Sequence, residues 1–484
     1  MERASRWLAL RNVSWAGLEA VSSVLVSFVA MLGIARLIGA AEFGLGALAI
    51  GITQMLSVIL GSLFHDALVR NPDLTKRHFD SAWTATLLLS GLALLICILL
   101  AHPLAHFFDE QRFAAVFIVM AITMIPDSAV VTLIAERRRE LDFRLVPLQF
   151  LAARLAGALA GVACAFFGLG VWSMIVQQWL TALLGPVILL YFGPYRPQIR
   201  LRLADLRPMI LFTSSIIATQ FVIQFAQRLM LIYVARIGDI TLAGYWGLAD
   251  RLIDALQKTI TNALYHVSLS HFALVQSEPA RLGKLVRQAN AWLAALIMPG
   301  LALIAITGPE IIDVLMGDDW APAGPPMQML AVGVMVQLRR LMDHVALNAM
   351  GRSEIAFMAY GLEAALTLSA LLIIGPVTLV GIAVLRAAQP LAGFGLIVLK
   401  AVRRTKRKLL IEAGEIGRDL LLTAMVGGTV WWTHGQIAPS MEPVLALIVS
   451  TLIALAATMI AIALFRPSLL SLAWSLLRVR TKAA

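Results

Sequence analysis

The chain has 484 residues, of which 60% are hydrophobic and only 14% are charged. Soluble domains carry about 25% charged residues, so this composition and a mean hydropathy of +0.85 exclude an ordinary soluble protein. An integral membrane protein is indicated instead. The net charge of +11 is concentrated in short loops between apolar segments. Cys97 and Cys164 lie inside apolar segments, which predicts buried thiols rather than a disulfide.

Apolar segments long enough to cross a bilayer recur along the whole chain. A hydrocarbon layer of about 30 Å requires about 20 apolar residues in a helix. The sequence therefore predicts an all-α membrane protein with about 14 transmembrane helices. The predicted spans are 15–35, 43–65, 81–107, 113–135, 145–167, 170–193, 209–235, 240–266, 289–316, 324–349, 355–375, 378–399, 419–437 and 443–465.

Lys and Arg residues are distributed unevenly between the loops. Most of the 39 lie in the N-terminal segment and in every second loop, whereas the intervening loops hold only Arg36, Arg112 and Arg236. Cytoplasmic loops of membrane proteins carry the excess of Lys and Arg, so we expect both termini in the cytoplasm. The densest loop, "KAVRRTKRK" (Lys400–Lys408), is expected to contact anionic membrane lipids. No nucleic acid partner is predicted.

One stretch of the sequence occurs twice. "ARLIGAAEFGLGALA" runs from Ala35 to Ala49, and "ARIGDITLAGYWGLA" runs from Ala235 to Ala249, with Ala, Arg, Gly, Leu and Ala at matching positions. The two stretches occupy equivalent places in two six-span halves, as in transporters built from parallel repeats. Small residues at such spacing are also typical of close helix packing.

The repeat and the loops predict the organisation of the chain. Two six-helix lobes precede a basic cytoplasmic loop, two extra transmembrane helices and a basic cytoplasmic tail. The predicted bounds, in that order, are 1–208, 209–400, 401–418, 419–466 and 467–484.

Seven basic side chains fall inside predicted spans, where an ionised group costs about 2.5–3.5 kcal/mol at the bilayer centre. They are Arg154, Arg228, Arg251, Lys258, Arg339, Arg340 and Arg386. Such a charge persists where it faces a wet cavity or an acidic partner. Arg154 and Arg386 have no acidic residue nearby on their own helices, which favours a cavity.

Two neighbouring spans carry polar stripes at helical spacing. Gln220, Gln224, Gln227 and Arg228 form one stripe, and Asp250, Asp254, Lys258 and Thr261 form the other. Pairing of Arg251 and Lys258 with the two aspartates is an alternative to cavity lining. For Arg339, pairing with Asp343 is as good an interpretation as ligand binding. The remaining excess of basic charge suits an anionic cargo such as a phosphate.

We accordingly predict a set of substrate-binding residues. The set is Arg154, Arg228, Arg251, Arg339, Arg386, Gln220, Gln224 and Lys258. Asp127 and Glu363 lie near the middle of their spans and are candidates for ion coupling. A partner Arg from another helix would explain either carboxylate equally well.

Enzyme motifs are absent from the sequence: it has no nucleotide-binding loop, zinc-binding histidine pair, CxxC set or nucleophile elbow. His102 and His106 lie near Asp109 without a convincing third ligand. We therefore predict no catalytic residue, no cofactor and no metal site, and a protein that is not an enzyme.

Four segments resemble the polysaccharide branch of the multidrug/oligosaccharidyl-lipid/polysaccharide exporter superfamily, in particular its Wzx-type flippases. They are "ARLIGAAEFGLGALA", "RRRELDFRLVP" (Arg137–Pro147), "GLGVWSMIVQQ" (Gly168–Gln178) and "ARIGDITLAGYWGLADRL" (Ala235–Leu252). The resemblance implies a V-shaped bundle around a central cavity in the bacterial inner membrane. It implies export of an undecaprenyl-pyrophosphate-linked oligosaccharide for exopolysaccharide or O-antigen synthesis, by alternating access, beside a polysaccharide polymerase and export complex.

Three other functions stay open at this point. A multidrug or cation antiporter of the same superfamily predicts a cavity dominated by carboxylates, whereas basic residues are in slight excess here. A membrane polymerase or ligase acting on lipid-linked glycans would carry a large outer loop, which the spans leave no room for. A scaffold without transport would not require charged residues at mid-bilayer.

Overall fold

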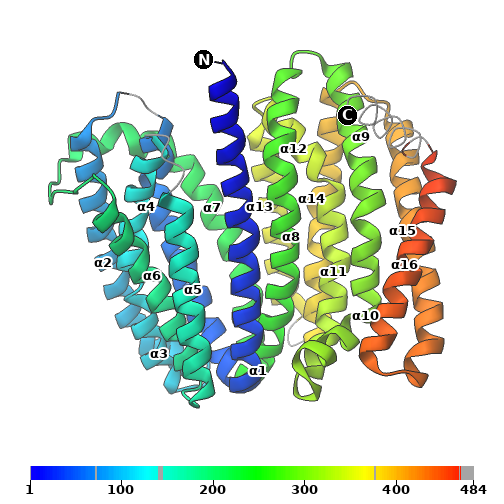
Figure 1. Cartoon of the computed structure of the whole chain (residues 1–484), viewed down its shortest axis with the longest axis horizontal. Coiled ribbons are helices and arrows are strands. Elements are labelled where there is room, and N and C mark those ends of the chain that lie inside the picture. Colours follow the sequence, from blue (N-terminus) through cyan, green and yellow to red (C-terminus); the bar gives the residue numbers. More distant parts are fainter. Residues whose placement is uncertain (1, 71–72, 140–144, 375–377, 468, 470–484) are drawn as a thin grey trace. The chain divides into compact units, whose positions relative to one another are not determined.

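The computed structural model describes residues 2–70, 73–139, 145–374, 378–467 and 469, and within them the side chains except those of 2–25, 66, 70, 208, 210–220, 222–223, 226–227 and 266. The described residues form sixteen α-helices and two short 3-10 helices, without a strand among them (Figure 1). The chain divides into an N-terminal unit, Met1–Gly247, and a C-terminal unit, Leu248–Ala484. The structure is therefore all-α, as the composition predicts.

The N-terminal unit begins with the longest helix. Its elements are α1 (Glu2–Arg70), α2 (Lys76–Phe107), α3 (Arg112–Ala121), α4 (Met124–Arg139), α5 (Leu145–Phe166), α6 (Trp172–Phe192), α7 (Leu203–Ile237) and the first residues of α8 (Ile240–Leu274). At 1.5 Å per residue, a straight helix of 69 residues would be about 100 Å long, three times a hydrocarbon layer. Instead α1 bends at Gly39, where φ is 79° and ψ is 170°.

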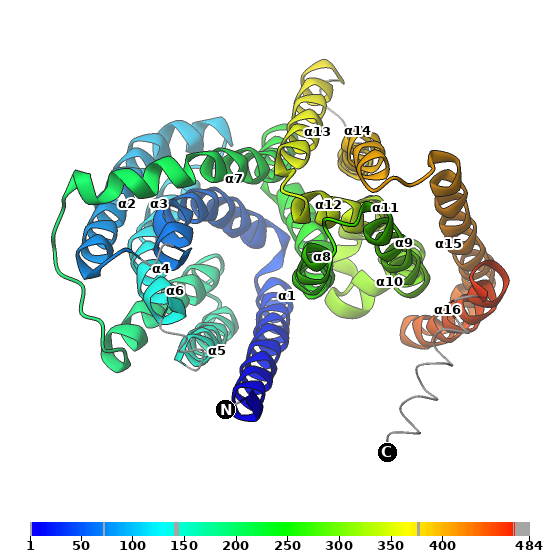
Figure 2. The same cartoon turned by 90° about the horizontal axis from the view of Figure 1, so that it is seen from above.

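The bend at Gly39 explains how one helix supplies two predicted spans. Figure 2, seen from above, shows the two segments of α1 diverging from the bend. A positive φ is strained for a residue with a side chain, and glycine adopts it readily. We call the end of the unit at which α1 bends the Gly39 end.

The opposite end of the N-terminal unit holds the basic loops and a compact core. Side chains of six helices pack there, including Phe64, Leu68, Phe79, Leu133, Val146, Leu189 and Met209. The linker between α6 and α7 is fixed to α2, since the Tyr195 hydroxyl donates to Asp80 Oδ1 at 2.7 Å and the Gln198 amide donates to the same oxygen at 3.1 Å. Burial and this contact raise the pKa of Tyr195 above its ordinary value.

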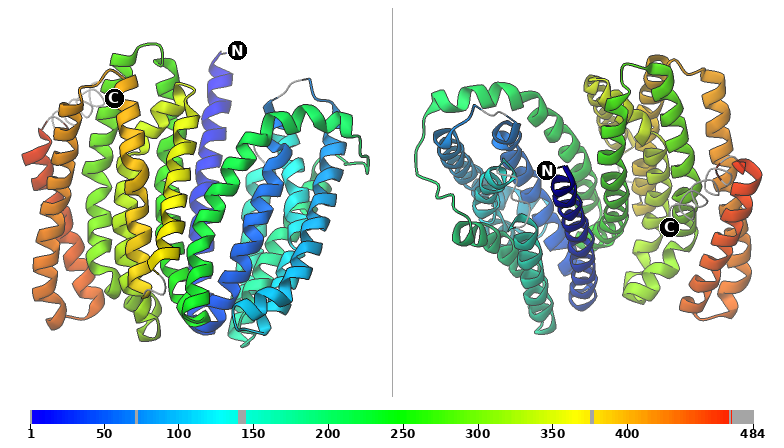
Figure 3. Two further views of the ribbon diagram at one scale, coloured as in Figure 1. Left: turned by 180° about the vertical axis from the view of Figure 1, so that it is seen from behind. Right: turned by 45° about the horizontal axis from the view of Figure 1, so that its top comes forward.

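The C-terminal unit contains the rest of α8 and the helices that follow. They are α9 (Pro279–Leu296), α10 (Met298–Met316), η1 (Asp318–Ala323), α11 (Gly324–Arg339), α12 (Leu341–Ala349), α13 (Ser353–Ile374), α14 (Leu379–Arg404), α15 (Leu409–Ile437), η2 (Ala438–Ser440) and α16 (Pro443–Phe465). The last two α-helices lie side by side (Figure 3). Ala446, Ser450, Ala454, Ala457 and Ala461 form the buried face of α16, and such small residues allow close helix approach.

All fourteen predicted spans coincide with helix, but three of them are interrupted. The predicted spans 113–135, 289–316 and 324–349 each contain a break, after Ala121, at Ile297 and at Arg340 respectively. Among the described residues, nine helical segments are long and apolar enough to cross a membrane. This smaller number arises because α1 counts once, α11 and α12 are short, α8 and α15 are more polar, and many side chains of α7 lie outside the described residues.

Candidate functional site

The two copies of the repeated stretch contact each other through equivalent residues of the N-terminal unit. A Cβ atom added to Gly44 would overlap the backbone oxygen of Ile240, and one added to Gly244 would overlap the backbone oxygen of Ala40. Each glycine thus faces the residue four positions before the other glycine. The repeat is therefore a two-fold-like helix contact that requires glycine at 44 and 244.

Arg228 lies on α7, which precedes α8 in the chain, and its side chain packs against α1. Its Cδ lies 3.6 Å from the position that a Cβ on Gly51 would occupy. Its Nε atom is buried, and no described residue accepts a hydrogen bond from it. Gln224, four positions earlier, is half-buried. The side chain of Gln220 lies outside the described residues.

Arg154 occupies the middle of α5, and its Nη1 lies 3.4 Å from the Ser27 hydroxyl oxygen of α1. Arg154 also makes a further interaction in the structure. In α4, Asp127 is half-buried, and no described residue donates a hydrogen bond to its carboxylate. The structure therefore leaves Asp127, of the two ion-coupling candidates, with its charge uncompensated among the described residues.

In the C-terminal unit, α8, α11 and α14 bring several of the predicted residues together. Asp250, Asp254, Gln257, Gln337 and Arg386 line a cavity of about 20 Å³, together with Ile253, Leu330, Gly333 and Val334. That volume holds about one water molecule and no sugar. Arg386 Nη1 donates to Gln389 Oε1 at 2.8 Å. The cavity thus assembles one guanidinium and two carboxylates around a polar space.

The two remaining basic residues of α8 lie near those aspartates. Lys258 Nζ is 2.7 Å from Asp254 Oδ2, four residues away on the same helix, and both side chains are partly exposed. The pairing alternative weighed from the sequence thus describes Lys258. Arg251 is half-buried and has interactions of its own within the structure.

Arg339 is part of a buried ion network that we call the Arg339 network. Its Nη2 donates to Glu412 Oε1 at 3.1 Å, its Nε is 2.9 Å from Asp419 Oδ2, and its Nη1 is 3.8 Å from Asp343 Oδ2. The network also includes Arg407, Glu415, Arg466 and Asn290. Its members come from α9, α11, α12, the 405–408 turn, α15 and the end of α16. Three carboxylates therefore surround the Arg339 guanidinium.

Arg340 and Glu363 form a second buried pair. Both guanidinium terminal nitrogens donate to the carboxylate, Nη2 to Oε2 at 3.1 Å, and Nη1 also donates to the Pro390 carbonyl at 3.2 Å. The guanidinium lies over the Tyr360 ring, 5.5 Å from its centroid. Gly393 leaves room for the pair, because a Cβ there would overlap Glu363 Oε1. Glu363 thus has the partner Arg from another helix that the sequence left open.

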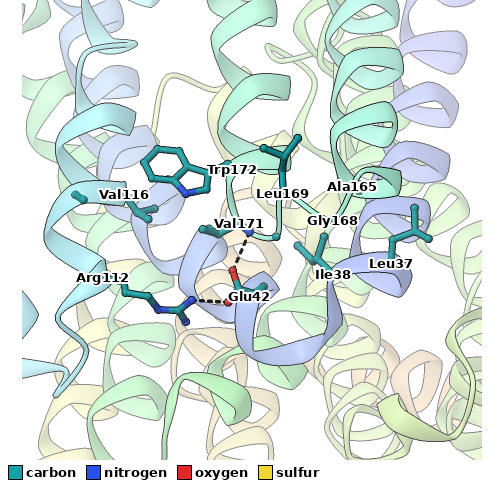
Figure 4. A pocket seen from close by; sticks show the side chains of 12 residues that line it. Leu37, Ile38, Glu42, Arg112, Val116, Ala165, Gly168, Leu169, Val171 and Trp172 are labelled. Carbon is teal, nitrogen blue, oxygen red and sulfur yellow. Dashed lines mark hydrogen bonds and ion pairs between the residues drawn. The ribbon is translucent and has the colours of Figure 1, made fainter.

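A larger pocket lies at the Gly39 end of the N-terminal unit (Figure 4). We call it the Glu42 pocket; it has a volume of about 580 Å³ and is lined by Leu37, Ile38, Glu42, Arg112, Ala115, Val116, Ala165, Gly168, Leu169, Gly170, Val171 and Trp172. Glu42 Oε1 accepts from Arg112 Nη1 at 2.6 Å, and Glu42 Oε2 accepts from the Val171 amide at 2.9 Å. Sequence reasoning missed this pocket. A carboxylate inside the repeated stretch was its only sequence signal.

The buried His434 and Ser450 and the half-buried Glu310 join α10, α15 and α16 in the C-terminal unit. His434 Nδ1 is 2.9 Å from the Ser450 hydroxyl oxygen, and His434 Nε2 is 3.0 Å from Glu310 Oε1. Ser450 is fully buried, so the arrangement holds helices together rather than presenting a nucleophile. Within the described part of the chain, no group of three or more metal-ligating side chains is assembled.

Comparison with known proteins identifies the class. A solved structure of the lipid II flippase MurJ in an inward closed conformation matches with a TM-score of 0.72, at 11% identity, covering 93% of this chain and 100% of that one. An inward-facing multidrug resistance MATE family transporter of the MOP superfamily matches with a TM-score of 0.57, at 14% identity, covering 80% and 94%. These likenesses establish an all-helical, multi-span membrane fold.

Sequence relatives narrow the class to a family. The succinoglycan biosynthesis transport protein ExoT of Rhizobium meliloti (strain 1021) is 24% identical over 328 residues, 66% of this chain and 65% of that protein. The lipopolysaccharide biosynthesis protein WzxC of Escherichia coli (strain K12) is 22% identical over 333 residues, 67% of this chain and 66% of that protein. The chain thus matches about two thirds of the length of these relatives.

A family model described as "Polysaccharide biosynthesis protein" matches residues 34–325, more than half of the chain. The chain therefore belongs to the polysaccharide biosynthesis protein family. The resemblance inferred from the four sequence segments is confirmed.

Proposed function

We propose that the protein is a flippase that moves an undecaprenyl-pyrophosphate-linked oligosaccharide from the cytoplasmic to the periplasmic leaflet of the bacterial inner membrane. Family membership, the relatives named for succinoglycan transport and lipopolysaccharide biosynthesis, and the fold shared with a lipid II flippase support it. The proposal includes fourteen spans, two six-helix lobes, cytoplasmic termini and alternating access. The cargo would supply exopolysaccharide or O-antigen synthesis.

The proposal depends most on one observation, the environment of Arg228. Its guanidinium lies inside α7 with a buried Nε that no described residue satisfies. An arginine in a membrane span is costly unless it faces water or a ligand. Arg also binds phosphate oxygens bidentately. We therefore assign Arg228 to the pyrophosphate of the cargo, together with Arg154 of α5 and with Gln224 and Gln220 of the same predicted stripe.

Arg386 is the matching candidate in the C-terminal unit. It shares a polar cavity with Asp250 and Asp254, which is too small for a sugar at about 20 Å³. A pyrophosphate oxygen binding there would have to compete with these two carboxylates. We therefore assign Arg386 and Arg251 to transient contact with the cargo, and Asp127 to ion coupling.

The other predicted residues receive structural roles in this proposal. Arg339 is surrounded by carboxylates at 2.9, 3.1 and 3.8 Å, and Lys258 is paired with Asp254. A phosphate approaching Arg339 would meet the negative charge of those carboxylates. Glu363 is held by Arg340, so we assign it to helix packing rather than to coupling.

Depletion of the protein tests the function directly. We expect undecaprenyl-linked repeat units to accumulate on the cytoplasmic leaflet and surface polymer to be lost. Arg228→Ala should weaken cargo binding about tenfold or more, which corresponds to about 1.4 kcal/mol, and complementation with it should restore little of the polymer. Arg36→Ala, at an exposed arginine of the repeated stretch, is the matched control and should restore it fully.

Other outcomes would replace the proposal. Normal glycan with increased sensitivity to cationic drugs would favour an antiporter, which the MATE likeness makes the second candidate. Accumulation on the periplasmic leaflet would place the block after flipping, at a polymerase or ligase. Full complementation by a well-expressed Arg228→Ala protein would remove Arg228 from the site.

A further inference from the structure

We propose that the Glu42 pocket binds a sugar residue of the glycan at the outer face, after the cargo has crossed. The proposal rests on the proposed function for the identity of the ligand, but the pocket itself lies within the N-terminal unit and away from Arg154 and Arg228. It is a second site for the same cargo, and it recognises sugar hydroxyls, whereas Arg228 recognises phosphate. Binding to it is measurable without transport.

The pocket has the size and the walls of a small-ligand site. Its volume of about 580 Å³ lies within the range of about 300–1,000 Å³ that is typical of such sites. Trp172 supplies an indole that is 39% exposed, and Val116 and Leu169 lie close to it in Figure 4. The apolar face of a pyranose ring packs on such an aromatic surface, which buries area at little entropic cost.

Hydrogen-bonding capacity remains at the polar wall. Glu42 accepts one hydrogen bond at each oxygen, from Arg112 and from the Val171 amide, and each carboxylate oxygen has a second lone pair. Arg112 uses Nη1 and Nε toward Glu42 and Glu110, and no described residue accepts from its Nη2. The side chain of Arg112 is 55% exposed. The wall thus offers acceptors and donors side by side, as adjacent sugar hydroxyls require.

The local charge selects against phosphate. Glu42 in the pocket and Glu110 beside it contact the Arg112 guanidinium at 2.6 and 3.1 Å, so these three side chains together carry one net negative charge. A pyrophosphate or a phospholipid phosphate would be repelled there, whereas neutral hydroxyls would not. The lipid-linked end of the cargo therefore belongs at Arg228, and the sugar end belongs in this pocket.

The pocket is built before any ligand arrives. Glu42 ties the turn after α5 to α1, since it accepts the Val171 amide at the start of α6. Gly170 adopts φ 56°, and a Cβ there would lie only 2.7 Å from Glu42 Oε2. Glycine at this position therefore admits the carboxylate. A rigid polar group of this kind binds with little loss of conformational entropy.

The location of the pocket fits a product site. The turns that line it lie at the Gly39 end, opposite the basic loops of the same unit. With the basic loops in the cytoplasm, as the proposed function has it, the pocket opens toward the periplasm. A glycan released on that side would meet it first.

Saturation-transfer NMR on the full chain in phosphatidylcholine nanodiscs tests the proposal. The probes are methyl β-glucopyranoside, methyl β-galactopyranoside and N-acetylglucosamine, each titrated separately. We expect saturable binding of at least one probe, with ring protons closest to the protein. Trp172→Ala should weaken it about tenfold, and Trp172→Phe should retain most of it.

Control variants distinguish sugar binding in the Glu42 pocket from binding elsewhere on the protein. Trp431→Ala removes another exposed tryptophan, on α15, and should leave binding unchanged. Glu42→Gln should also weaken binding, but it alters hydrogen bonds that hold α1 to the start of α6. Trp172→Ala keeps those hydrogen bonds, so it tests the pocket without disturbing the fold. Equal binding by the wild-type and Trp172→Ala proteins, or no saturable binding of any probe, would overturn the proposal.

Two competitors give the remaining outcomes. Binding of inorganic pyrophosphate that Trp172→Ala weakens would overturn the charge argument. Binding of tetraphenylphosphonium that Trp172→Ala also weakens would assign the pocket to organic cations.

If depletion gives no lipid-linked intermediate but sugar still binds through Trp172, the proposed function fails alone. If flipping is found and no sugar binds, the pocket proposal fails alone.

Discussion

At the scale of single residues, glycines decide where charged and backbone groups can approach. Gly44 and Gly244 allow backbone contact between the repeated stretches, and Gly393 admits the Arg340–Glu363 pair. In each case an added methyl group would overlap an oxygen atom. Gly91 of α2, by contrast, has open space around its Cβ position. Glycine is therefore required at some of these positions and replaceable at others.

Gly44→Ala and Gly244→Ala should each destabilise the protein by about 1–3 kcal/mol, because the methyl group forces the two backbones apart. The measurement is the apparent Tm of the purified protein. Gly91→Ala in α2 is the control and should leave the Tm unchanged or slightly raised. Equal Tm values for all three variants would show that the helices separate without cost.

Glu363→Gln should cost about 3–5 kcal/mol, since it leaves the Arg340 guanidinium buried without a counter-charge. Replacing both residues, as Arg340→Met with Glu363→Met, should recover most of the stability. The apparent Tm reports both. Arg352→Ala removes an exposed partner of Glu354 and should change stability by less than about 1 kcal/mol. A double variant less stable than Glu363→Gln would contradict this reasoning.

At the scale of helices, the Arg339 network explains how α15 and α16 are attached to the C-terminal unit. The alanine-rich face of α16 packs on α15 through apolar contact, and Arg466 at the end of α16 reaches Glu415 and Asp419 of α15. Arg339 and Arg407 then connect α15 to α11 and α12. The two additional helices are therefore bound by charge at one end and by close packing along their length.

Arg339→Met should loosen α15 and α16 without unfolding the rest of the unit, because Glu412 and Asp419 lose their common counter-charge. Hydrogen exchange followed by mass spectrometry should show about tenfold faster exchange in the first turns of α15. Arg418→Ala is the control, since this exposed arginine contacts Glu415 at the edge of the network. Unchanged exchange in Arg339→Met would show that apolar packing alone holds the helices.

At the scale of the whole molecule, transport requires a cargo site and a source of free energy. Arg228 and Asp127 are charged side chains of the N-terminal unit that keep polar atoms without a described hydrogen-bond partner. A carboxylate in a membrane span persists where a cation neutralises it. These two residues thus divide the tasks of cargo binding and ion coupling in our proposal.

Asp127→Asn should leave the protein folded and remove the dependence of glycan export on the ion gradient. Export measured with and without a protonophore, and with and without sodium, should respond in the wild-type protein and not in the variant. Glu354→Gln, at an exposed carboxylate, is the control and should respond as the wild type does. If export by the Asp127→Asn protein still responded fully to the ion gradient, another group would have to couple the ion.

The fold class, the helical segments and the family resemblance could all be predicted from the sequence. Membrane insertion depends on local hydropathy and length, and both are properties of contiguous residues. The breaks at Ile297 and Arg340 could not be predicted, because they depend on packing against other helices. For Lys258 and Arg339, the sequence allowed either ion pairing or substrate binding, and only the structure distinguishes these two roles.

The sequence by itself determined which segments form long apolar helices and which of these helices contain charged residues. Only the tertiary structure decided which charges are compensated: Arg339 and Arg340 meet carboxylates from distant helices, whereas Arg228 keeps a buried Nε without a described acceptor. It also brought Glu42, Arg112 and Trp172 to one pocket. The reason is that electrostatic partners lie within about 4 Å in space, and that distance bears no relation to separation along the chain.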